Sequence, residues 1–87
     1  MDLMEKNIRE LYARVLQPHG IELVSISDGS TAEANPQDFD LDITQRTLVE
    51  FKKGNIEVNT TFYSSEIAKI EKSMKDVQLE FALKEGT

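Results

Sequence analysis

The sequence predicts an α+β fold: a three- to four-stranded antiparallel sheet with N- and C-terminal helices packed on one face. Two observations predict it. Both ends of the chain carry apolar residues three and four positions apart, which is the spacing of one helical face, and the middle carries them at alternate positions, as on one face of a strand. Because 87 residues suffice for one small core, we expect a single domain over residues 1–87, in the order α-β-β-β-α.

The first helix is predicted over residues 3–17, with Asp2 as N-cap and Glu5 completing a capping-box pattern. Its apolar face comprises Met4, Ile8, Leu11, Tyr12, Val15 and Leu16. Pro18 and Gly20 follow it, and both are typical of a helix end.

Residues 21–27 are rich in β-branched and aliphatic side chains and predict the first strand. Asp28-Gly29 is a hairpin signal, so residues 30–34 could pair back onto that strand, and the sequence leaves this open. Residues 35–37 are predicted to form a loop.

The clearest strand pattern lies in the next segment. Apolar or neutral residues occupy the odd positions Phe39, Leu41, Ile43, Gln45, Thr47, Val49 and Phe51, and polar residues the even positions Asp38, Asp40, Asp42, Thr44 and Arg46. After a predicted four-residue loop at residues 52–55, the inward positions become Ile56, Val58, Thr60 and Phe62. We therefore expect a hairpin that pairs Phe51 with Ile56, Val49 with Val58, and Thr47 with Thr60.

A second helix is predicted from about Glu66, with Ser64 and Ser65 offering capping hydroxyls and Gly86 ending it. Residues 77–84 also alternate like a strand, so that alternative stays open. Leu79 and Leu83 fall outside the helix's main apolar stripe, and this excess predicts self-association. The candidate self-association residues are Ile67, Ile70, Met74, Val77, Leu79, Phe81 and Leu83.

Charge is concentrated in one segment. Residues 22–42 hold six acids and neither Lys nor Arg, whereas the flanking segments are balanced, so this segment accounts for the net charge of −6. A localised field of one sign can select a basic partner. The candidate partner-binding residues are Glu22, Asp28, Glu33, Asp38, Asp40, Asp42 and Glu57. The competing interpretation is a solvated strand face whose charges discourage edge pairing.

Chemistry-bearing motifs are scarce, so we expect no enzyme, cofactor or metal site. The triplet Asp38, Asp40 and Asp42 resembles the start of a calcium loop, but Ile43 and Val49 stand where such a loop needs Gly and Glu. The chain has no Cys, and its single His lacks a local acid–base partner. No nucleophile-elbow or phosphate-binding glycine motif is present.

We therefore expect a small acidic interaction protein that inhibits or regulates a basic, nucleic-acid-handling protein. Phage anti-restriction and anti-CRISPR inhibitors that mimic DNA act this way, and the analogy is one of charge and size. One alternative is a homodimeric chaperone or assembly adaptor. Another is an RNA-binding module, because the element order is similar to that of double-stranded-RNA-binding domains and Lys69, Lys72 and Lys75 lie on the second helix. The net negative charge argues against direct nucleic-acid binding.

The expected location is the cytoplasm. Neither a secretory leader nor an apolar run of membrane-spanning length is recognisable, and the absence of Cys fits a reducing compartment. We accordingly expect no membrane partner.

Overall fold

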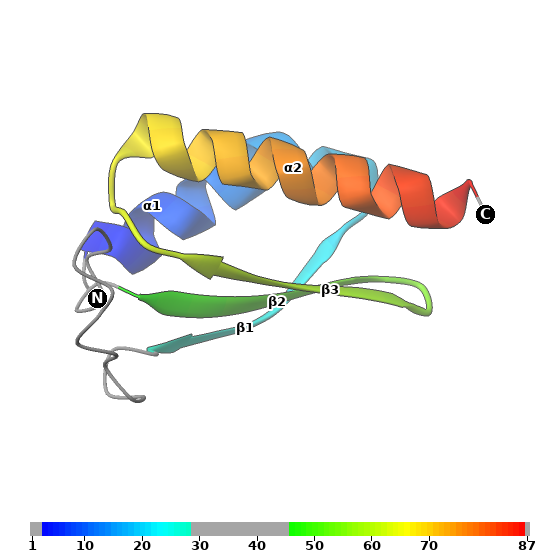
Figure 1. The fold of residues 1–87 in the computed structure, drawn as a ribbon, viewed down its shortest axis with the longest axis horizontal. Coiled ribbons are helices and arrows are strands. Elements are labelled where there is room, and N and C mark those ends of the chain that lie inside the picture. The colour runs from blue at the N-terminus through cyan, green and yellow to red at the C-terminus, as the bar shows by residue number, and fades with distance from the viewer. Residues whose placement is uncertain (1–2, 29–45, 87) are drawn as a thin grey trace, which may run out of the picture.

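The computed structural model describes residues 3–28 and 46–86 and confirms the α-β-β-β-α order (Figure 1). The elements are α1 (Leu3–Leu11), a π-helical segment (Tyr12–Leu16), a 3₁₀ turn (Gln17–His19), β1 (Glu22–Asp28), β2 (Thr47–Lys53), β3 (Ile56–Phe62) and α2 (Ile67–Glu85). The cap proposed at Asp2, the hairpin signal at Gly29, the possible strand 30–34 and the strand positions up to Gln45 lie outside the described residues.

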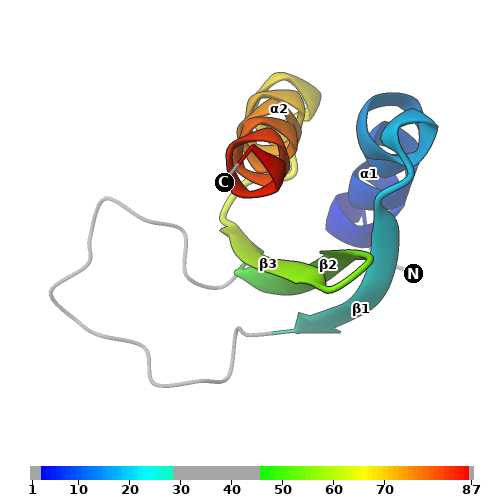
Figure 2. The same ribbon diagram turned by 90° about the vertical axis from the view of Figure 1, so that its right-hand side faces the viewer.

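The three described strands form one antiparallel sheet in the order β1-β2-β3. Both helices lie side by side on one face of this sheet, as Figure 2 shows, so the predicted α+β architecture is confirmed. No described element covers the opposite face of the sheet.

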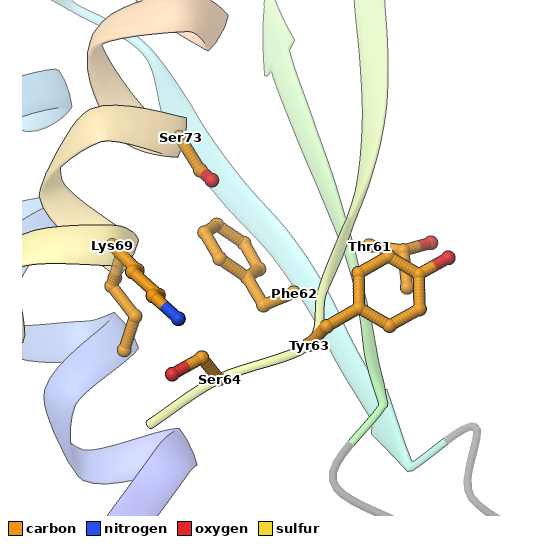
Figure 3. A pocket seen from close by; sticks show the side chains of 7 residues that line it. Thr61, Phe62, Tyr63, Ser64, Lys69 and Ser73 are labelled. Atoms are coloured by element: carbon orange, nitrogen blue, oxygen red, sulfur yellow. The ribbon is translucent and has the colours of Figure 1, made fainter. Parts of the chain in front are cut away.

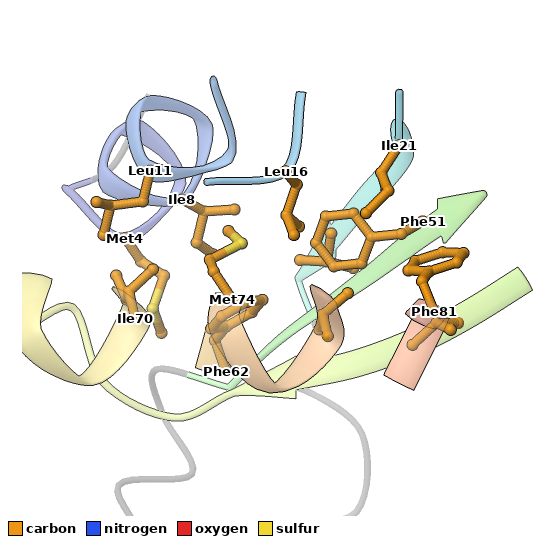
Figure 4. Packing of buried hydrophobic residues seen from close by; sticks show 13 residues of the cluster. Met4, Ile8, Leu11, Leu16, Ile21, Phe51, Phe62, Ile70, Met74 and Phe81 are labelled. Carbon is orange, nitrogen blue, oxygen red and sulfur yellow. The ribbon is translucent and has the colours of Figure 1, made fainter. Parts of the chain in front are cut away.

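The hydrophobic core fills the space between the helices and the sheet (Figure 4). Thr47, Val49 and Phe51, at the odd positions of β2, point into it as their alternation predicts. The ring of Tyr12 stacks on Phe51 at 6.2 Å and 22°, and its hydroxyl donates to the carbonyl of Ile21 at 2.6 Å. The start of β1 and the π-helical segment are thereby held against the sheet.

Residues 77–84 belong to α2, which resolves the ambiguity between helix and strand. Val77 and Phe81, one turn apart, are buried, whereas Leu79 and Leu83 are exposed. In a helix, positions four apart share one face, so these two pairs lie on different sides. The alternation of apolar residues over 77–84 therefore comes from two apolar stripes on different sides of one helix, and not from a strand.

The predicted register of the central hairpin is wrong by two residues. The observed pairs are Thr47 with Phe62, Val49 with Thr60, Phe51 with Val58, and Lys53 with Ile56. The connection is a two-residue turn at Gly54-Asn55, because Gly54 adopts φ 61° and primed turns use a positive φ at that place. A shift of two residues keeps every side chain on its predicted face, so the faces were right although the pairs were not.

Replacing Gly54 with Ala is expected to lower the free energy of unfolding by about 1–2 kcal/mol, because an L side chain is strained at φ 61°. No atom within 4 Å would meet the added methyl group, so the effect isolates backbone strain. Gly86→Ala, where φ is −77°, is the matched control and should leave stability nearly unchanged. Urea denaturation of the two variants makes the comparison; equal losses would contradict the proposed turn.

The first helix departs from the predicted uniform span 3–17. The α-helix ends at Leu11, a π-helical segment follows to Leu16, and a 3₁₀ turn continues to His19. Leu11 and Leu16 are both buried although they are five residues apart. A wider turn with i→i+5 bonding brings residues at that spacing closer to one face, which accounts for the change. Gly20, at φ 77°, then redirects the chain into β1.

A hydrogen bond from Asn7 links α1 to the connection between β3 and α2. Its side chain is buried, and its amide Nδ2 donates to the Ser65 carbonyl at 2.8 Å. The expected hydroxyl N-cap of α2 is not formed, because the capping residue is Glu66 and makes no side-chain cap bond. The Ser64 hydroxyl instead accepts the Glu66 N–H at 3.1 Å.

Candidate protein-binding face of the sheet

The uncovered face of the sheet is built from the alternate residues that point away from the helices. On β2 these are Leu48, Glu50 and Lys52, and on β3 they are Glu57, Asn59 and Thr61. Each residue of the first set lies directly opposite one of the second, in the order Leu48–Thr61, Glu50–Asn59 and Lys52–Glu57. Opposed side chains in an antiparallel pair are about 4.5–5.5 Å apart at Cβ, so the six form one continuous patch.

Three carboxylates dominate this patch. Glu22 on β1 and Glu57 on β3 lie on either side of Lys52, which is paired with both of them across the sheet. Glu50 occupies the middle of β2, between Ser25 and Asn59. We call Glu22, Glu50 and Glu57 the acidic sheet face. All three are exposed, and with Lys52 the patch carries a formal charge of −2, three acids against one base.

Apolar surface accompanies these charges. Leu48 is 43% exposed at the end of β2, where it lies opposite both Ser27 and Thr61. Val24 is 51% exposed and sits at the irregularity between Leu23 and Ser25, where it has no partner on β2. Protein interfaces combine apolar contacts with a polar rim, so this mixture fits a protein partner better than a purely electrostatic one.

The predicted partner-binding residues fall into two groups. Glu22 and Glu57 both lie on the acidic sheet face, on either side of Lys52. The backbone of Asp28 ends β1, opposite Thr47. Glu33, Asp38, Asp40 and Asp42 lie outside the described residues. Asp28 and Thr47, the strand ends on either side of that segment, pair with each other at one end of the sheet.

Sequence reasoning missed Glu50. It lies outside the base-free segment and is followed by Lys52 and Lys53, so a charge count along the chain treats it as neutralised. The alternation that extends from Asp38 through Arg46 would have found it, because Glu50 continues the same even-numbered face.

The proposed self-association residues are divided by the fold. Ile70, Met74, Val77 and Phe81 are buried in the chain's own core and face the sheet and α1. Ile67, Leu79 and Leu83 remain exposed, at 49%, 59% and 64%. The outward apolar surface of α2 therefore reduces to the Leu79–Leu83 pair, with Ile67 at the opposite end of the helix.

Neither the described part of the chain nor the comparison with known proteins identifies a metal site, a membrane-spanning helix or a family. Within residues 3–28 and 46–86, no group of three or more His, Cys, Asp or Glu side chains could hold a metal ion. Neither of the helices in that part of the chain is long and apolar enough to cross a bilayer. No protein-family model, curated protein or solved structure matches the sequence or fold.

Proposed function

We propose that this chain is a small non-enzymatic interaction protein whose uncovered sheet face binds a basic, nucleic-acid-handling protein and inhibits or regulates it. The observation that carries the proposal is the placement of the acidic sheet face. The fold sets Glu22, Glu50 and Glu57 on the face that the helices leave free. The other face of the sheet packs against the helices in the core, so it is not available to a partner.

The charge and exposure of the carboxylates support a nucleic-acid-binding partner. Glu22, Glu50 and Glu57 stand on the three adjacent strands β1, β2 and β3, one on each, and all three are exposed. Lys and Arg side chains that bind phosphates can also pair with exposed carboxylates. The segment that joins β1 to β2 adds Glu33, Asp38, Asp40 and Asp42, against Arg46 as its one base.

A pull-down at two salt concentrations tests the proposal. The wild-type chain should capture a basic protein at low ionic strength and release it as salt rises, because exposed charges are screened. The Asp38→Asn, Asp40→Asn and Asp42→Asn triple variant should capture less of it. The captured protein, identified by mass spectrometry, should lose nucleic-acid binding or cleavage when the wild-type chain is added.

A matched variant separates surface recognition from total charge. Glu10→Gln, Glu66→Gln and Asp76→Asn also remove three negative charges, but from exposed positions on the helical side. This control should retain the partner. Equal loss of partner capture in both triple variants would mean that the acidic residues only confer solubility. That result would contradict the proposal.

The exposed Leu79–Leu83 pair favours a second candidate, a homodimeric assembly adaptor. Two leucines one turn apart on α2, 59% and 64% exposed, can pack against their copies. Sedimentation velocity should then show a dimer that the Leu79→Gln, Leu83→Gln variant lacks, with the stability of the monomer unchanged within about 0.5 kcal/mol. A wild-type chain that stays monomeric at high concentration would exclude this candidate.

A further inference from the structure

The outer edge of β3 presents backbone groups that no described strand pairs. β3 is the last strand in the sheet order, and within the described residues no strand lies beyond it. The pair Lys53–Ile56 closes the two-residue turn, and hydrogen-bonded pairs alternate along an antiparallel ladder. The backbone N–H and C=O groups of Glu57, Asn59 and Thr61 therefore point away from β2. The Lys84 ammonium lies 3.4 Å from the Glu57 carbonyl, which agrees with that orientation.

A half-open pocket of about 170 Å³ adjoins this edge, between the end of β3 and the first turns of α2 (Figure 3). The buried side chains of Phe62 and Ile70 contribute its apolar lining. Its polar lining comes from Thr61, Tyr63, Ser64, Lys69 and Ser73. Sites for whole small molecules usually enclose about 300–1,000 Å³. This volume instead suits one side chain of a larger ligand.

The polar groups of the pocket are mainly donors. The Ser64 hydroxyl already accepts the Glu66 N–H, which leaves its own O–H to donate. The Ser73 hydroxyl has no hydrogen-bond partner among residues 3–28 and 46–86. The Lys69 ammonium is 3.3 Å from the Glu66 carboxylate, but the two side chains are 69% and 65% exposed. Such an exposed surface pair is weak, so Lys69 can exchange Glu66 for another carboxylate.

We propose that an extended acidic peptide segment of a partner protein adds to the edge of β3 and places a carboxylate in this pocket. Its backbone would pair with Asn59 and Thr61, and its residue opposite Phe62 would project to the helix side. This follows because directly opposed residues share one face of a sheet. Backbone pairing then gives affinity and the Lys69–Ser64–Ser73 donors give specificity, as in other cases of strand addition. The site is separate from the acidic sheet face and does not depend on the proposed function.

Amide-detected NMR titration with two synthetic peptides tests this. One is an acetylated, amidated Thr-Val-Thr-Glu-Thr-Val-Thr peptide, and the other carries Gln in place of Glu. We expect shift changes at the amides of Asn59 and Thr61, and about three- to tenfold tighter binding of the Glu peptide. Lys69→Gln should abolish that preference. Lys72→Gln, an exposed position outside the pocket lining, should preserve it.

Asn59→Pro provides a second variant, since it removes an outward N–H while leaving the ladder to β2 intact, and circular dichroism verifies its fold. Binding of both peptides should be lost. The proposal is overturned if neither peptide binds, if both bind equally, or if Lys72→Gln and Lys69→Gln have equal effects. It is also overturned if the edge amides are protected before any peptide is added and the mass rises with concentration, because a second copy then occupies the edge.

Discussion

Replacing Phe51 with Ala is expected to lower the free energy of unfolding by about 3–5 kcal/mol, because it removes a large buried side chain and leaves a cavity. Phe51 is 1% exposed, occupies the middle strand and stacks on Tyr12. A chain of 87 residues has a total stability of about 4–13 kcal/mol at typical values per residue. The variant should therefore lose a large share of its stability and melt more than about 10 °C lower.

Thermal unfolding followed by circular dichroism measures this loss. Leu79→Ala is the control, because it also removes a large apolar side chain but from a position that is 59% exposed. Its effect should stay within about 0.5 kcal/mol. If the two substitutions cost the same, the core does not lie between α2 and the odd face of β2.

Reversing the charge of the acidic sheet face is expected to slow association with the basic partner. The substitutions Glu22→Lys, Glu50→Lys and Glu57→Lys change an acidic patch into a basic one on exposed positions, so the fold should be retained. Electrostatic steering raises association rates by about 10–10³-fold, and reversal should remove that gain at low salt. Stopped-flow association with the captured partner measures the rate.

The salt dependence distinguishes steering from other effects. As ionic strength rises, the rates of wild type and variant should converge, because the Debye length falls to about 8 Å at physiological salt. The control reverses Glu10 on α1, Glu66 at the N-cap of α2 and Asp76 on α2, all of which are exposed. A rate loss in the control as large as in the sheet-face variant would mean that only net charge matters.

The fold could be predicted largely because its two periodicities are unambiguous in the segments that build the core. Val49 and Phe51 alternate as a half-buried strand requires, and Ile70, Met74 and Val77 recur at helical spacing. The register of the hairpin could not be predicted with the same certainty. Shifts by two residues preserve both faces, so the hydrophobic pattern does not distinguish a four-residue loop from the two-residue turn that Gly54 permits.

The candidate site was only partly accessible to sequence reasoning. Glu22 and Glu57 are 35 positions apart in the chain, and only strand pairing through Lys52 brings them together. Glu50 was not predicted as a site residue, because a count of charges along the chain does not show which residues are neighbours across the sheet. The pocket beside β3 has no linear signature at all, since Ser64, Lys69 and Ser73 come together through the angle at which α2 leaves the strand.

Carboxyl footprinting of the complex tests the central claim most directly. Free and partner-bound chains are labelled at exposed carboxylates, and the modification of each residue is quantified by mass spectrometry. If the uncovered sheet face is the binding surface, Glu50 and Glu57 should lose labelling in the complex while Glu66 and Asp76 on the helical side label as before. Protection of Glu66 and Asp76, with Glu50 and Glu57 still labelled, would contradict the account.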